Sequence, residues 1–168
     1  MNLDFYIDFI KVKHGNQTRK HGTPYYLHPV SVSACLAKKG FTRDYLIAAL
    51  FHDLLEDTNT TYDEILHISS PEIAEAVRLV TKEDGYDMKE YIDRIKQNDI
   101  ARIVKLADRW HNLLEATQAS PKYQKKYIKE TEDWYLDLAK DTIFEEDINN
   151  VLQTLKTHYH DNDELSVN

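Results

Sequence analysis

The chain has 168 residues, of which 42% are hydrophobic and 30% charged, and its formal net charge is -8. This length and apolar content are enough for one domain with its own core. The acidic charge argues against general nucleic-acid binding, and no apolar run approaches the ~20 residues of a membrane helix. Cys35 is the single cysteine, so an internal disulfide is excluded. Because the N-terminus also lacks a signal-peptide pattern, we expect a cytoplasmic protein.

Helix signals dominate the sequence, since only four glycines and four prolines interrupt it. Pro29, Pro71 and Pro121 stand at early helical positions, and Gly40 follows two lysines at a helix end. The expected helices cover, in chain order, residues 3–12, 28–39, 43–57, a short segment opened by the capping-box pattern of Thr61 and Glu64, 71–81, 86–97, 98–117, 120–140 and 145–158. We therefore predict an all-α, single-domain bundle of eight or nine helices over residues 1–160, followed by a disordered tail over 161–168.

Positive charge gathers in the N-terminal quarter of the chain. Residues 1–40 carry six basic and two acidic residues, whereas the remainder carries 15 basic and 27 acidic residues. A small cationic segment on an acidic chain suits a small anionic ligand better than a polymer. A solvated basic turn is the alternative interpretation.

The helix expected over 43–57 is apolar on all sides up to Phe51 and then turns polar. His52 and Asp53 follow directly, and Glu56 and Asp57 come within the next turn. Three carboxylates at the end of a buried helix repel one another, lose hydration and face the negative end of the helix dipole. A cation would compensate this charge, so the segment predicts a metal site.

Two further polar residues could complete such a site. Asp108 is set into the apolar face of the helix expected over 98–117, where an ion pair with Lys105 or Arg109 is the alternative. His28 precedes Pro29 at a helix start, where a simple polar cap is the alternative. Two imidazoles and two carboxylates form a nitrogen and oxygen set that suits a divalent first-row metal, which can activate water and polarise a phosphoryl oxygen.

Three ordered blocks resemble the hydrolase domain of the RelA/SpoT-type alarmone enzymes, within the HD superfamily of metal-dependent phosphohydrolases. The blocks are RKHGTPYYLHP at residues 19–29, HDLLEDT at 52–58 and KLADRWHNL at 105–113. The HD superfamily signature of His, His-Asp and Asp is matched by His28, His52, Asp53 and Asp108.

The resemblance implies an HD-domain fold and a role for each matching residue. The four signature residues would hold a single Mn²⁺, and Glu56 with Asp57 would be the catalytic acidic pair. Arg19 and Lys20 would bind the nucleotide near its base and phosphates, and Asn112 would contact the ribose side. The implied reaction removes pyrophosphate from the 3′ position of (p)ppGpp and yields GDP or GTP. We expect a stand-alone small hydrolase acting on this anionic nucleotide, and the sequence leaves homo-oligomerisation open.

Two other functions remain alternatives. One keeps the metal chemistry but changes the substrate, as in a 5′-nucleotidase or an NADPH phosphatase. The other is a nucleotide sensor that binds without turnover. The remaining histidines that we weighed, including His14, are interpreted as surface or packing residues, and Tyr25 either shapes the pocket or packs within its loop.

Overall fold

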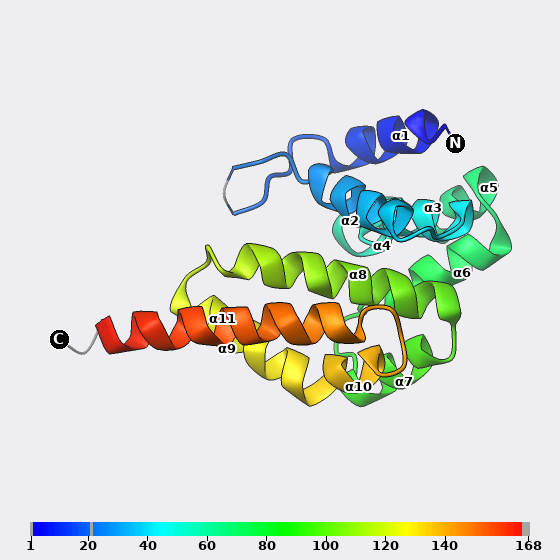
Figure 1. The fold of residues 1–168 in the computed structure, drawn as a ribbon. Coiled ribbons are helices and arrows are strands. Elements are labelled where there is room, and N and C mark those ends of the chain that lie inside the picture. Colours follow the sequence, from blue (N-terminus) through cyan, green and yellow to red (C-terminus); the bar gives the residue numbers. More distant parts are fainter. Residues whose placement is uncertain (1, 21, 166–168) are drawn as a thin grey trace. The chain divides into compact units, whose positions relative to one another are not determined.

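The computed structural model describes residues 2–20 and 22–165, with side chains through residue 159. Its helical elements are α1 (Asp4–His14), α2 (Leu27–Lys38), α3 (Arg43–Phe51), α4 (Leu54–Asp57), α5 (Tyr62–Ile68), α6 (Pro71–Val80), α7 (Met88–Lys96), α8 (Asp99–Ala116), α9 (Pro121–Glu130), the π-helical η1 (Thr131–Tyr135), α10 (Leu136–Ala139) and α11 (Glu145–Leu165), as Figure 1 shows. Within these described ranges there is no β-strand, so the predicted all-α class is confirmed. Helix α11 extends past the expected end at residue 158, and residues 166–168 of the expected tail lie outside the described residues.

The chain divides into two compact units, Met1–Lys105 and Leu106–Asn168. The boundary falls inside α8, after its first two turns. The assignment of one domain to residues 1–160 stays a prediction.

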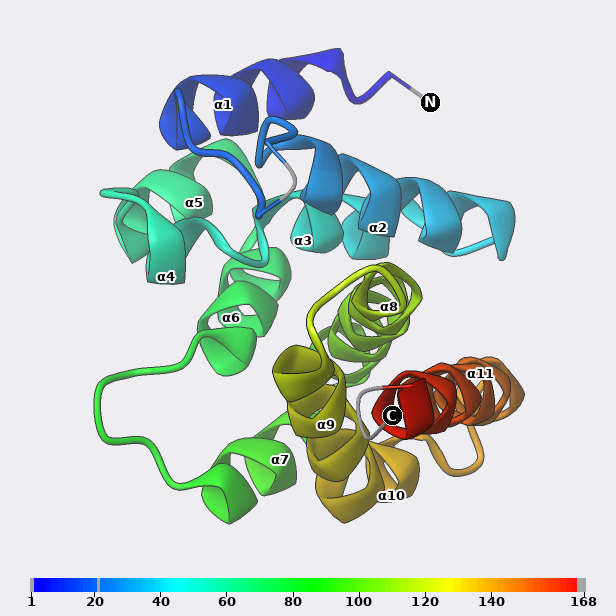
Figure 2. The same ribbon diagram turned by 90° about the vertical axis from the view of Figure 1, so that its left-hand side faces the viewer.

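Helix α3 is the centre of the first unit. Its residues Leu46 to Phe51 are each at most 4% exposed, which fits a helix that is apolar on every side. Helices α1, α2 and α6 pack against it, and α5 and α7 pack in turn against α6 (Figure 2). A polar side chain at the C-terminal end of α3 is therefore surrounded by the buried apolar core of the first unit.

The helix starts of the first unit follow the capping signals of the sequence. Thr61 and Glu64 form the predicted capping box, with both reciprocal hydrogen bonds present. Ser70 accepts from the amide of Ile73, and Asn98 accepts from the amide of Ala101. Each cap satisfies a backbone donor that the helix itself leaves open, which is why these starts could be located from sequence.

The second unit contains one long helical run rather than the regular helix expected over 120–140. Helix α9, η1 and α10 follow one another without a break, and α11 packs against both α9 and α10 (Figure 1). The hydroxyl of Thr131 donates to the carbonyl oxygen of Tyr127 at 2.6 Å. This back-bond competes with the regular helical pattern at the point where the π-helical turn begins.

A buried arginine packs against this helical run. The Arg109 guanidinium lies 3.8 Å from the centroid of the Tyr135 ring and 4.9 Å from that of Tyr127. It also donates to Glu130 at 3.0 Å, so the ion pair of Arg109 is with Glu130. Stacking and a charge-assisted hydrogen bond together fix this part of α8 within the second unit.

In the part of the chain that the structure describes, no helix is both long and apolar enough to cross a membrane.

We expect Glu130→Gln to lower the free energy of unfolding by about 1–3 kcal/mol, because it weakens the partner of a buried guanidinium. The Arg109 side chain is 6% exposed and that of Glu130 31%. The matched control is Asp133→Asn, which removes the partner of Lys129 in a pair whose side chains are 75% and 43% exposed. That change should cost no more than about 0.5 kcal/mol. Chemical denaturation of the two variants measures both losses of unfolding free energy. Equal losses would contradict a special role for the buried pair of Arg109 and Glu130.

Candidate functional site

The predicted His52-Asp53 doublet lies where the buried helix is interrupted. We expected one helix over 43–57, but α3 ends at Phe51 and α4 begins at Leu54. His52 Nδ1 bonds the carbonyl oxygen of Ala49 at 2.7 Å. In a continuous helix that carbonyl would accept from the Asp53 amide. The His52 ring therefore replaces a backbone hydrogen bond, and the doublet stands in a turn.

His28 approaches the same turn from the first turn of α2. Its amide donates to the carbonyl of Tyr25 at 2.9 Å, and its ring centroid lies 5.2 Å from that of His52. Both histidines are at most 3% exposed. The Nε2 atoms of His28 and His52 lie 3.8 and 3.0 Å from one oxygen, Oδ2 of Asp53. Two imidazoles and one carboxylate are thus brought together within the first unit.

These three residues fit a divalent cation. Because His52 Nδ1 carries the proton that it donates to Ala49, its Nε2 has the lone pair that a metal requires. Two imidazole nitrogens beside a carboxylate oxygen form a donor set typical of first-row divalent metals. The burial of both rings would exclude competing water from that side of the ion.

The two predicted catalytic acids have different surroundings. Asp57 Oδ2 accepts from the hydroxyl of Tyr25 at 2.9 Å, and the same hydroxyl lies 2.8 Å from Asp53 Oδ2. Glu56 instead accepts from the backbone amide of Lys82 at 3.0 Å, on the segment between α6 and α7. Asp57 is therefore linked to the Asp53 carboxylate through the Tyr25 side chain, whereas Glu56 is oriented by a backbone amide.

Electrostatics around Tyr25 favour the neutral forms of Asp57 and of the Tyr25 phenol. Desolvation, and then the charge of Asp53, raise the pKa of Asp57, although the residue as a whole is exposed. Burial raises the pKa of the Tyr25 phenol, and both neighbouring carboxylates raise it further. Tyr25 therefore stays a hydrogen-bond donor at any working pH, and Asp57 holds a proton more readily than an ordinary surface aspartate.

The basic residues Arg19 and Lys20 lie on the loop between α1 and α2. The loop is held by a backbone bridge between Thr18 and Pro24 and by the Arg19 amide, which donates to Thr23 at 2.9 Å. The Arg19 guanidinium lies 5.9 Å from the centroid of the Tyr25 ring, and Lys20 is exposed. The structure thus places Arg19 beside Tyr25, whose hydroxyl contacts both Asp53 and Asp57.

Asp108 and Asn112 lie in the second unit, one turn apart on α8. Asp108 is 5% exposed, and its Oδ1 accepts from Asn112 Nδ2 at 2.6 Å. An amide that orients a carboxylate in this way is typical of the residues that surround metal ligands. Asp108 stays a predicted ligand, and the ribose contact of Asn112 stays a prediction.

Sequence reasoning gave no role to two neighbours of the site. The sequence leaves open whether Tyr25 shapes the pocket or packs within its loop. Its hydrogen bonds with Asp53 and Asp57 join residues 28 and 32 positions apart, which local patterns do not show. His14 is 2% exposed, stacks on Tyr25 with centroids 4.8 Å apart, and bonds Gln17 at 2.9 Å. The position of Tyr25 one turn before His28 was the available signal, since residues three apart share a helical face.

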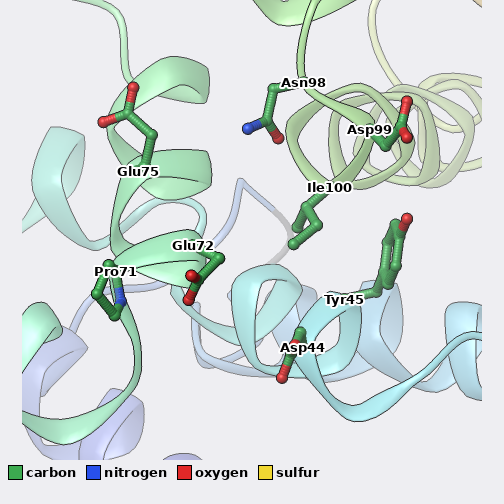
Figure 3. Close-up of a pocket in the computed structure, with 8 residues that line it drawn as sticks. All are labelled: Asp44, Tyr45, Pro71, Glu72, Glu75, Asn98, Asp99 and Ile100. Atoms are coloured by element: carbon green, nitrogen blue, oxygen red, sulfur yellow. The ribbon is translucent and has the colours of Figure 1, made fainter.

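A separate cavity of about 550 Å³ opens elsewhere on the first unit, at the start of α8 (Figure 3). It is lined by Asp44, Tyr45, Pro71, Glu72, Glu75, Asn98, Asp99 and Ile100. Desolvation and the charge of Asp99 raise the pKa of Tyr45. Four carboxylates disfavour an anionic ligand, so this cavity is not where a nucleotide phosphate would bind.

Comparison with known proteins agrees with the predicted resemblance. A guanosine-3′,5′-bis(diphosphate) 3′-pyrophosphohydrolase of Aquifex aeolicus is 37% identical over 140 residues, which are 79% of this chain and 20% of that protein. The bifunctional (p)ppGpp synthase/hydrolase SpoT of Escherichia coli is 34% identical over 137 residues, which are 75% of this chain and 20% of that protein. The chain thus spans about a fifth of the length of these curated relatives.

Solved structures share the fold. A metazoan ortholog of SpoT, described as hydrolysing ppGpp, superposes with a TM-score of 0.78 at 23% identity, over 90% of this chain and 93% of that one. The protein lmo0812 of Listeria monocytogenes gives a TM-score of 0.58 at 21% identity, over 82% and 99% of the two chains. Residues 7–142 match the family described as HD domain. The chain belongs to the HD-domain family.

Proposed function

We propose that the protein hydrolyses guanosine 3′,5′-bis(diphosphate)-type alarmones, releasing pyrophosphate from the 3′ position to leave GDP or GTP. The observation that carries this proposal is the convergence of His28 and His52 on Asp53, with Asp57 joined to the same carboxylate through Tyr25. Relatives at 34–37% identity that are named (p)ppGpp hydrolases support the choice of substrate.

The cation of this proposal is a single Mn²⁺ held by His28, His52, Asp53 and Asp108. The donor set of the first unit supports a divalent first-row metal, and Asn112 keeps Asp108 in a defined orientation. When bound, such an ion lowers the pKa of a water molecule and polarises a phosphoryl oxygen.

The acids would manage the proton of the attacking water. Asp57, whose pKa is raised, is suited to accept a proton from the water and to pass it on to the 3′ oxygen of the departing nucleotide. Glu56 accepts a hydrogen bond from the Lys82 amide and would orient the water. The water oxygen bonds to the phosphorus attached to the 3′ oxygen as the bond between that phosphorus and the 3′ oxygen breaks. The 3′ oxygen takes up a proton to give GDP or GTP, and the pyrophosphate carries the oxygen of the water.

The basic loop would bind the substrate. Arg19 and Lys20 supply positive charge on a mostly acidic chain, and a bidentate guanidinium matches phosphate geometry. We assign the ribose side to Asn112. A nucleotide substrate and a single cysteine favour the cytoplasm as the place of the reaction.

Product analysis tests the substrate. After incubation with Mn²⁺ and ppGpp, ion-exchange chromatography should show GDP and pyrophosphate, and pppGpp should give GTP and pyrophosphate. NADPH and 5′-mononucleotides, incubated in parallel, should remain intact. If only one of these other compounds is hydrolysed, the protein acts on another class of nucleotide, and the proposed metal site is retained.

Two substitutions should separate metal binding from proton transfer. Asp53→Ala should lose Mn²⁺ and activity together, because it removes the carboxylate on which both histidines converge. Glu56→Ala should keep Mn²⁺ and lose turnover by about 100-fold or more, the contribution typical of an acid or base. Metal content is measured by elemental analysis after gel filtration and turnover by pyrophosphate release. Full activity in Glu56→Ala would move the acid-base role to another residue.

Asp57→Asn should raise the melting temperature of the metal-free protein by a few degrees near neutral pH. The raised pKa means that ionised Asp57 disfavours the folded state, and the cost disappears where Asp57 is protonated in both states. The gain should therefore shrink as the pH falls toward about 4, the ordinary range of aspartate. Thermal melts in EDTA measure it, with Asp8→Asn as an exposed control. A loss of stability in Asp57→Asn at neutral pH would contradict this electrostatic account.

A further inference from the structure

The loop between α1 and α2 is joined to Asp53 and Asp57 through two of its side chains, Gln17 and Tyr25. The Tyr25 hydroxyl lies within 2.9 Å of both Asp53 Oδ2 and Asp57 Oδ2, and Gln17 Nε2 donates to the backbone carbonyl of Asp57 at 2.7 Å. These contacts come from residues at opposite ends of the loop. They hold the loop against α4 without using any residue of the predicted substrate contacts.

Tyr25 itself is fixed from several directions. Its amide donates to the Gln17 carbonyl at 2.9 Å, and its own carbonyl accepts from the His28 amide at the start of α2. Its ring stacks on His14 and meets the edge of the His28 ring, with centroids 4.8 and 6.2 Å apart. A phenol oxygen held by backbone bonds and two rings is a rigid point of reference for the carboxylates.

The two carboxylates need such a reference. Asp53 and Asp57 are four residues apart and repel each other when both are ionised. Free rotation would let each side chain turn toward solvent. The phenol donates its hydroxyl proton toward Asp53 Oδ2 and Asp57 Oδ2, which share it, so that Asp53 Oδ2 stays directed at the His28 and His52 nitrogens.

We infer that Tyr25 is a positioning residue that sets the Asp53 carboxylate for the cation and the Asp57 carboxylate for the attacking water. This inference rests on the proposed function and deepens it. It also connects substrate binding with the chemistry, because Arg19 contacts the ring of the same tyrosine. The role depends on the hydroxyl alone, since the ring contacts would remain in a phenylalanine.

Tyr25→Phe is the direct test. Isothermal titration should show Mn²⁺ affinity reduced about 10- to 100-fold, the range seen when a partner of a metal ligand is removed. With saturating Mn²⁺ and ppGpp, kcat should still fall at least about 10-fold, while KM stays within about threefold. The control is Tyr6→Phe, which loses a phenol oxygen that accepts from Arg43 at 3.0 Å in the same unit. Its Mn²⁺ affinity and kcat should match the wild type.

A double-mutant cycle separates positioning from general destabilisation. In an Asp57→Asn background, Tyr25→Phe should change the residual kcat less than twofold, yet still weaken Mn²⁺ binding through Asp53. An equal loss of kcat in both backgrounds, or wild-type Mn²⁺ affinity in Tyr25→Phe, would overturn the inference. The Mn²⁺ titration needs no nucleotide. If the Mn²⁺ affinity depends on the Tyr25 hydroxyl but the protein leaves ppGpp intact, the proposed substrate is refuted while this part of the inference is upheld.

Discussion

The hydrogen bond from His52 to the Ala49 carbonyl decides where chemistry can occur on this fold. It stands at the end of a helix whose residues from Leu46 onward are buried, and it interrupts that helix after Phe51. The turn that results turns His52 and Asp53 toward the start of α2. It also fixes which ring nitrogen carries a lone pair. One side-chain hydrogen bond at the helix end thus orients the His52 ring and leaves its Nε2 atom for the cation of the proposed function.

Negative charge is the second constraint, and it works against stability. Asp53 and Asp57 crowd one phenol, and desolvation and repulsion raise the pKa of Asp57. A fold selected only for stability would replace one of these acids by a neutral residue. Their presence together fits a site that gains its compensating charge from a cation and that needs a readily exchanged proton.

Local signals made most helix boundaries predictable, and side-chain hydrogen bonds to helical carbonyls explain the exceptions. Thr61, Ser70 and Asn98 cap helices through contacts three residues away, which a sequence displays directly. The break at His52 and the π-helical turn at Thr131 arise when a side chain takes a helical carbonyl, and hydrophobic periodicity does not register this. The grouping of His28 with His52 and Asp53 was expected from the family resemblance. The bridging by Tyr25 was not, because it joins a loop to a helix across some 30 residues.

The distribution of charge then explains why the basic loop must be held in place. The first unit has an acid-lined cavity at Asp44, Glu72, Glu75 and Asp99, and an anion would be repelled there. The cationic loop supplies attraction, but an exposed loop with glycines would by itself present its charges over a wide range of positions. Gln17 and Tyr25 anchor that loop to α4 beside Asp57. Under the proposed function, phosphate binding by Arg19 and proton transfer by Asp57 are therefore coupled through Gln17 and Tyr25, so a displacement of the loop would also displace Asp57.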